Sequence, residues 1–199
     1  MAAGFIRLFL VAAALLTSTN AFAHTGAGEA SGFVHGFSHP VSGLDHVLAM
    51  VMVGVLAWQL GGRALWLVPA SFVGVMAAGG VLGVAGAGVP FVELGIAVSV
   101  VALGAMVALG IKAPVAIAMG VVGLFAIFHG HAHGAEMPED AGGIAYAAGF
   151  MIATALLHLA GIGLGFLLGR TDASRGSVFV RAAGGFAAVA GIGILAGVL

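Results

Sequence analysis

Six long apolar runs, separated by short connectors, account for most of the chain. Each run approaches or exceeds the length of about 20 residues that a helix needs to cross the hydrocarbon core of a bilayer. None alternates apolar and polar residues as the strands of a membrane barrel do. The pattern predicts an all-α membrane protein, with a bundle of six transmembrane helices forming one domain over residues 39–199. The runs cover residues 39–60, 64–86, 90–110, 113–133, 142–169 and 177–198.

A seventh, shorter apolar run lies at the N-terminus. Arg7 precedes the run of residues 8–16, and an Ala-x-Ala sequence ends at Ala23. A basic start, a short apolar core and a small-residue cleavage site are typical of a secretory signal peptide. We expect residues 1–23 to be cleaved, the alternative being an uncleaved anchor. Cleavage would leave residues 24–38 as a short N-terminal segment on the outer face.

Composition supports the membrane class. Hydrophobic residues make up 62% of the 199 residues and charged residues only 7%, whereas soluble domains contain roughly 25% charged residues. The 35 glycines fit closely packed transmembrane helices, and glycine stripes such as Gly161, Gly165 and Gly169 are candidate helix contacts that leave self-association open. The net charge of −1 gives no basic surface for nucleic acid. The absence of cysteine excludes thiolate ligands and disulfides.

The connectors predict the orientation in the membrane. If the mature N-terminus is outside, every basic residue after the leader falls on the inner side: Arg63, Lys112, Arg170, Arg175 and Arg181. The outer connectors, residues 86–89 and 134–143, contain no Lys or Arg. This distribution follows the positive-inside rule. We therefore expect a multi-pass protein of a bacterial inner membrane, with both mature ends on the periplasmic side.

Ionisable residues at the start of the first run form the first candidate cluster. His39, Asp45 and His46 lie where apolar helix begins, and such groups inside a membrane segment are candidate functional sites. A helix beginning near Pro40 would place His39 and His46 on one side, two turns apart.

Asp45 has more than one interpretation. It could bind a metal directly, or it could orient a histidine ring. A third alternative is a purely local role, because Ser42 and Asp45 have the spacing of a capping box. Met50, one turn after His46, is either a soft thioether ligand or ordinary core.

The second candidate cluster ends the fourth run. His129, His133 and Glu136 follow i, i+4, i+7 spacing and share a face if the helix continues, while His131 points largely the other way. A solvated histidine-rich loop is the alternative interpretation. Glu93 begins the third run on the same side of the membrane. Three helices thus place ionisable groups at one depth.

Other histidines are weaker candidates. His24 and His35 belong either to a weak metal site or to an exposed tail. His158 lies mid-span, one turn after Thr154. It is either a second binding position on the path of an ion or a partner in a hydrogen bond between helices. Imidazole and carboxylate together suit Ni²⁺, Co²⁺, Zn²⁺ and Cu²⁺. We predict a metal site from His39, Asp45, His46, Glu93, His129, His133 and Glu136, with His24, His131 and His158 less certain.

At these two clusters the sequence resembles the HupE/UreJ family of nickel/cobalt membrane permeases. One signature of the family resembles His, five residues, then Asp-His, as in His39 to His46. Its other signature resembles FHG-x-x-HG-x-E, as in Phe128 to Glu136. The resemblance covers essentially the whole chain. It implies that the cluster residues and an acidic residue of the third span, here Glu93, matter for transport, and it links the chain indirectly to supply of nickel to hydrogenase or urease.

These observations favour a transporter, not an enzyme, that imports Ni²⁺ or a similar divalent ion as its substrate. We expect no prosthetic group. The chain has no GxxxxGK[ST] motif, so no means of using ATP is visible. The main alternative is an intramembrane zinc hydrolase built on the same histidines. An outer-face metal sensor is a third hypothesis. The sequence does not distinguish nickel from cobalt, zinc or copper, nor proton coupling from transport driven by the membrane potential alone.

Overall fold

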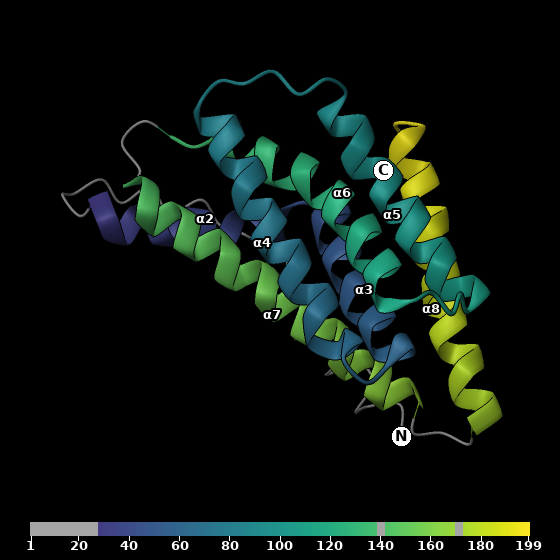
Figure 1. The fold of residues 1–199 in the computed structure, drawn as a ribbon. Coiled ribbons are helices and arrows are strands. Elements are labelled where there is room, and N and C mark those ends of the chain that lie inside the picture. The colour runs from purple at the N-terminus through teal and green to yellow at the C-terminus, as the bar shows by residue number, and fades with distance from the viewer. Residues whose placement is uncertain (1–27, 139–141, 170–172) are drawn as a thin grey trace, which may run out of the picture.

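The computed structural model describes residues 28–138, 142–169 and 173–199 (Figure 1). The proposed signal peptide and His24 lie outside these residues. The described part is all helical, with seven helices and no strand. They are α2 (Gly28–Ser42), α3 (Leu44–Leu60), α4 (Ala64–Val84), α5 (Val92–Leu109), α6 (Val115–Ala135), α7 (Gly143–Gly169) and α8 (Ala173–Leu195). Helices satisfy their own backbone hydrogen bonds, which is what a segment inside hydrocarbon requires.

Helix α3 is the centre of the bundle and contacts every other described helix. Its middle turns, from Met52 to Ala57, are buried throughout. Around α3 the most extensive helix pairs are α4 with α6, α5 with α8, and α7 with both α2 and α3. Figure 1 shows α4 and α7 side by side at the front and α5 with α8 at the right. The protein is therefore a layered helix bundle around one apolar core.

Glycines allow the helix pairs to approach closely. A Cβ atom on Gly130 of α6 would collide with the carbonyl of Met76 in α4, and Gly83 of α4 lies against the backbone of Gly134. On α7, Gly161 lies against Val51 of α3. The prediction that the glycine stripe of the fifth run is a helix contact is confirmed: this stripe packs on α3.

Five helices are long and apolar enough to cross a membrane: α4, α5, α6, α7 and the part of α8 from Val178 to Leu195. The first predicted span differs from the expected single rod. It is a broken pair, in which residues 32–42 of α2 and Leu44–Leu60 of α3 meet at an angle of 82°. Counting this pair as one span gives six. The chain is thus a multi-pass membrane protein, in which the bent pair of α2 and α3 forms either a broken span or a re-entrant loop.

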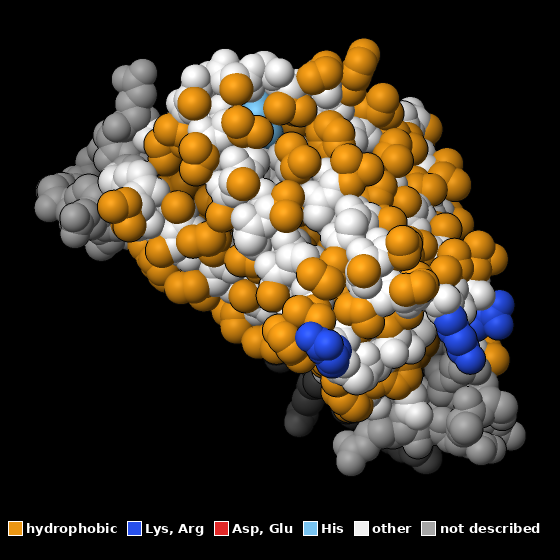
Figure 2. Space-filling view, in the orientation of Figure 1, with side chains coloured by type: hydrophobic (Ala, Val, Ile, Leu, Met, Phe, Trp, Pro, Cys, Tyr) orange, Lys and Arg blue, Asp and Glu red, His pale blue; other side chains and the backbone are white. Residues whose placement is uncertain are grey.

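The two ends of the bundle differ in charge. Arg63 precedes α4, and Lys112 lies between α5 and α6, so both occupy the end where α3 meets α4. Figure 2 shows Lys and Arg side chains gathered at the lower end of the visible face. The start of α3 and the end of α6, which carry the histidine clusters, lie at the opposite end. The predicted separation of basic residues from the clusters is seen for these described residues.

Candidate metal site

The break before α3 brings the first cluster together. The prediction of a continuous helix beginning near Pro40 is wrong, because Pro40 lies inside α2 and Gly43 adopts an extended conformation (φ −97°, ψ 125°) between α2 and α3. The Ser42 hydroxyl donates to the carbonyl of His39 at 2.7 Å and ends α2. It does not cap α3, so the capping-box interpretation of Asp45 is not supported. His39 consequently lies on α2 and His46 on α3.

Asp45 orients His46. One carboxylate oxygen of Asp45, Oδ1, accepts both the backbone N–H of His46 at 2.8 Å and its ring Nδ1–H at 2.9 Å. The first turn of a helix favours a negative charge, so Asp45 is also stabilised by its position. The bond to Nδ1 leaves Nε2 of His46 as the nitrogen able to bind a ligand.

Helix α6 brings the second cluster to the first. The helix ends at Ala135, one residue before Glu136, and the Glu136 carboxylate accepts a hydrogen bond from His39 Nε2–H at 3.0 Å. His133 lies one turn earlier, with its ring stacked on Phe150 of α7 at 5.1 Å between ring centroids. The two sequence clusters are therefore in contact, as the sequence predicted.

Four imidazole rings form a continuous series from the end of the bundle to its interior. The ring centroids of His39 and His133 are 4.8 Å apart, those of His133 and His46 are 4.9 Å apart, and those of His46 and His129 are 4.8 Å apart. Phe72 of α4 then lies 5.5 Å from His129 and 5.1 Å from His158. Successive rings are inclined to one another at interplanar angles between 57° and 88°, and all the pairs except Phe72 with His129 meet edge to face.

Exposure is highest at the Glu136 and His39 end of this series and low at the three inner rings. The Glu136 side chain is 56% exposed, that of His39 28% and that of His46 13%, while His129 and His133 are fully buried. Four buried ring nitrogens have no hydrogen-bond partner: His46 Nε2, His129 Nδ1 and both nitrogens of His133. A buried polar atom without a partner destabilises a fold by about 1–3 kcal/mol and requires an explanation. Binding a cation would provide one.

The described donors do not yet form a coordination sphere. Within residues 28–138, 142–169 and 173–199, no three His, Asp or Glu side chains converge so as to hold a metal ion. The rings touch through edges and faces, so their nitrogens would have to turn toward a common point. The arrangement therefore supplies donors of the right chemistry in mutual contact, without a formed coordination sphere.

Ser99 is a residue of this site that the sequence analysis missed. It lies mid-helix in α5, is fully buried, and its hydroxyl is 3.0 Å from His129 Nε2. The signal was present in the sequence, because Ser99 is the one polar residue between Glu93 and the end of α5. Polar residues inside transmembrane helices are commonly there to bond across helices.

The other candidate residues lie apart from this series. Glu93 is exposed in the first turn of α5 and makes no described hydrogen bond or ion pair with the cluster. His131 donates from Nε2 to the carbonyl of Ala87 at 2.7 Å, on the connector that follows α4. Met50 is fully buried in the core around α3. His35 is exposed, with its ring 6.3 Å from that of His39.

His158 lies beyond His129, on the other side of the Phe72 ring. It is 1% exposed, and neither ring nitrogen has a hydrogen-bond partner. The hydroxyl of Thr154, one turn earlier, instead faces the sulfur of Met76 at 3.7 Å. The hydrogen bond between helices that was the alternative role for His158 is thus not formed in this conformation.

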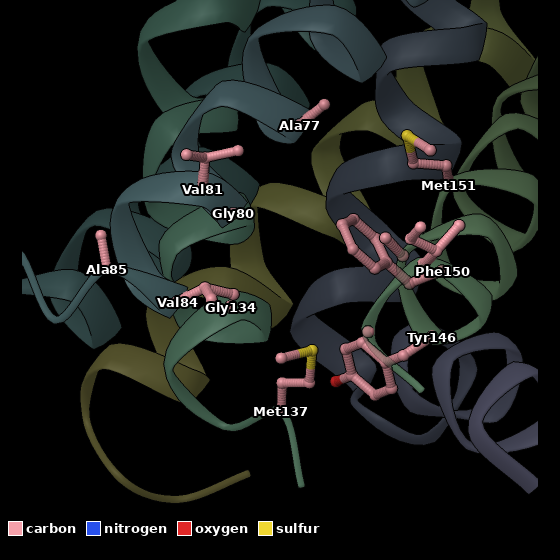
Figure 3. A pocket seen from close by; sticks show the side chains of 13 residues that line it. Ala77, Gly80, Val81, Val84, Ala85, Gly134, Met137, Tyr146, Phe150 and Met151 are labelled. Atoms are coloured by element: carbon pink, nitrogen blue, oxygen red, sulfur yellow. The ribbon is translucent and has the colours of Figure 1, made fainter. Parts of the chain in front are cut away.

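An apolar cavity of about 580 Å³ lies beside the histidines, between α4 and α7. Figure 3 shows Tyr146, Phe150 and Met151 on one side of it and Ala77, Val81 and Val84 on the other. Its lining offers almost no donors for a cation, so this cavity is not the ion site. Phe150 nevertheless forms both its wall and the surface on which His133 stacks.

Comparison with known proteins identifies the family. The family model for HupE / UreJ protein matches residues 12–194 of this chain. The chain is 49% identical to Protein HupE of Rhizobium leguminosarum bv. viciae over 185 residues, which cover 93% of this chain and 95% of that protein. No solved structure matches significantly. A match over nearly the whole chain shows that this protein belongs to the HupE/UreJ family.

Proposed function

We propose that the protein is a secondary transporter that imports a divalent transition-metal ion, with nickel foremost and cobalt next. The observation that carries this proposal is the series of four touching imidazoles that leads from the partly exposed His39 to the buried His129. Neutral imidazole with carboxylate is a donor set that suits these ions. Membership of the HupE/UreJ family supports the choice of a metal ion as substrate.

The proposed path begins at the outer face of a bacterial inner membrane. The Glu136 carboxylate and His39 capture the ion at the exposed end, and Glu93, exposed at the same end, adds negative charge. The positions of Arg63 and Lys112 at the other end support this orientation through the positive-inside rule. Both mature ends then face the periplasm.

The ion then moves inward through exchange of ligands. His133 and His46 have buried nitrogens without partners, and these nitrogens would replace the water lost from the ion. His129 follows, and His158, on the far side of Phe72, is the proposed second binding position. Stepwise exchange keeps each binding event weak enough for the ion to leave.

The membrane potential is sufficient to drive uptake. An inside-negative potential favours a divalent cation by about 4.6 kcal/mol per 100 mV, twice the value for one elementary charge. No ATP is then required. Imported nickel would serve the maturation of a nickel enzyme such as hydrogenase or urease.

The proposal is tested by cellular accumulation of Ni²⁺, Co²⁺ and Zn²⁺ in the parent and in the His46→Ala and His133→Ala variants. Both variants should lose accumulation by about tenfold or more, because each removes a nitrogen donor from the centre of the series. Membrane content of each variant is measured alongside. Normal accumulation of every ion in both variants would refute the site. Hydrolytic activity that depends on His46, without ion accumulation, would instead favour the zinc hydrolase.

A further inference from the structure

The Ser99 hydroxyl has one proton and two neighbours. Its oxygen is 2.6 Å from the carbonyl of Ile96 and 3.0 Å from Nε2 of His129. A carbonyl oxygen can only accept, so a contact of 2.6 Å without a proton between the two oxygens would be repulsive. The hydroxyl proton therefore goes to Ile96, and the serine oxygen must accept the proton of His129 Nε2.

This assignment fixes the tautomer of His129. A neutral imidazole carries one N–H, and a charged ring here would be a fully buried cation without an ion pair, which is strongly unfavourable. With the hydrogen on Nε2, the lone pair lies on Nδ1. That atom is buried and has no hydrogen-bond partner.

His46 is held in the opposite tautomer to His129. Asp45 Oδ1 accepts from Nδ1–H at 2.9 Å, so the lone pair of His46 lies on Nε2, which is also buried without a partner. The rings of His46 and His129 are adjacent, with centroids 4.8 Å apart. Each therefore has one nitrogen held by the protein and one nitrogen left for a ligand.

We propose that Ser99 is a positioning residue of the metal site, which holds His129 Nε2–H so that His129 binds the ion through Nδ1 while His46 binds it through Nε2. The inference deepens the proposed function, on which its metal-binding part rests. Outer hydrogen-bond partners of this kind set both the tautomer and the orientation of metal-binding histidines.

The tautomers are measured by nitrogen NMR on full-length, metal-free protein containing ¹⁵N-labelled histidine, at a pH where imidazole is neutral. His129→Gln and His46→Gln identify the signals. We expect a protonated Nε2 and an unprotonated Nδ1 for His129, and the reverse for His46. The opposite tautomer at His129 would overturn the inference, whether or not the protein transports metal.

Titration of the same sample with Zn²⁺ alone, a diamagnetic probe, tests which atoms bind. The Nδ1 signal of His129 and the Nε2 signal of His46 should shift most, while the two protonated nitrogens keep their hydrogens. If Nε2 of His129 loses its hydrogen and shifts instead, the assignment of the binding atoms is wrong.

Substitution of Ser99 provides the functional test, and the chain offers a matched control. Ser71 of α4 makes the same bond to a carbonyl three residues earlier, to Val68 at 2.9 Å, but has no described histidine partner. Ser99→Ala should mix the His129 tautomers and weaken Zn²⁺ binding by about 10–100-fold. Ser99→Thr should restore both, and Ser71→Ala should change neither. A Ser99→Ala protein with parental tautomers and affinity would overturn the positioning role.

Discussion

His131 and His133 lie two residues apart in one histidine tract, yet their surroundings differ. The His133 ring touches two other cluster imidazoles, whereas His131 bonds outward to the Ala87 carbonyl. We expect His133→Ala to reduce nickel uptake by about tenfold or more and His131→Ala to leave most of it. Initial rates of uptake, normalised to membrane content, make this comparison. Equal loss in both variants would contradict the assignment.

Substitution of His158 distinguishes a role in transport from a role in stability. Both of its ring nitrogens are buried without partners, so His158→Leu removes an unfavourable feature while filling a similar volume. We expect the variant to be as stable as the parent, or more stable by up to about 1–3 kcal/mol, and to transport more slowly. Thermal unfolding in detergent and uptake are measured on the same protein. If the well-folded variant transports at the rate of the parent, His158 is not a binding position on the ion path.

At the residue scale, the sequence predicted which histidines meet but not how they are held. Spacing along a helix indicates that His129 and His133 share a face, and this is sufficient to place them. It gives no information on Ser99, whose role depends on the rotation of α5 against α6. The same rotation explains Glu93: Gly95 lies against the Phe128 ring, so the face of α5 that reaches the cluster carries Ser99 and leaves Glu93 exposed.

The break between α2 and α3 is the element on which the site depends. Gly43 has backbone angles that any residue can adopt, but a Cβ atom there would lie 2.7 Å from Asp45 Oδ1 and 3.2 Å from His46 Nδ1. We expect Gly43→Ala to retain the fold and to reduce uptake, because the added methyl group displaces the Asp45–His46 pair. Thermal unfolding and uptake are measured together.

Gly74→Ala in α4 is the matched control for this change. No atom outside its own helix lies within 4 Å of a Cβ atom at Gly74, and alanine in a helix interior is favoured over glycine by about 0.5–1 kcal/mol. This variant should be at least as stable as the parent and should transport normally. If Gly43→Ala also transports normally, the Asp45–His46 pair does not need the space that the missing side chain of Gly43 leaves.

At the scale of the helix, length and hydropathy predicted five of the six runs well, because long apolar segments have one favourable conformation in hydrocarbon. The first run was predicted as one rod, since Pro40 suits the first turn of a helix. The bend arises from tertiary contact: Gly36 of α2 lies against the backbone of Tyr146, and Gly149 of α7 lies against that of Phe33. Such a contact cannot be inferred from α2 alone.

Acid should slow the whole transporter. Histidine binds metal only in its neutral form, so protons compete with the ion at the partly exposed end of the series, where the ion enters. Lowering the outside pH from about 7.5 to about 5.5 crosses the range in which histidine usually gains its charge. We expect slower uptake at the lower pH at a fixed membrane potential. Uptake that does not change over this range would contradict a path lined by histidine.

For the whole molecule, composition and the distribution of basic residues were sufficient to predict a helical membrane bundle with the clusters at one end. The motifs were sufficient to predict the family, which the match over residues 12–194 confirms. The arrangement of α4 on α6 and α5 on α8 was not predictable, because hydropathy alone does not determine which helices are neighbours.

The central claim is that this chain alone carries a divalent metal ion across a membrane by way of its histidine series. It is tested most directly by uptake of Ni²⁺ into proteoliposomes that contain only the purified protein, without ATP and with an imposed inside-negative potential. We predict saturable uptake that grows with the potential and is lost in His46→Ala and His133→Ala. Absence of uptake by correctly folded protein, or equal uptake by these variants, would contradict the account.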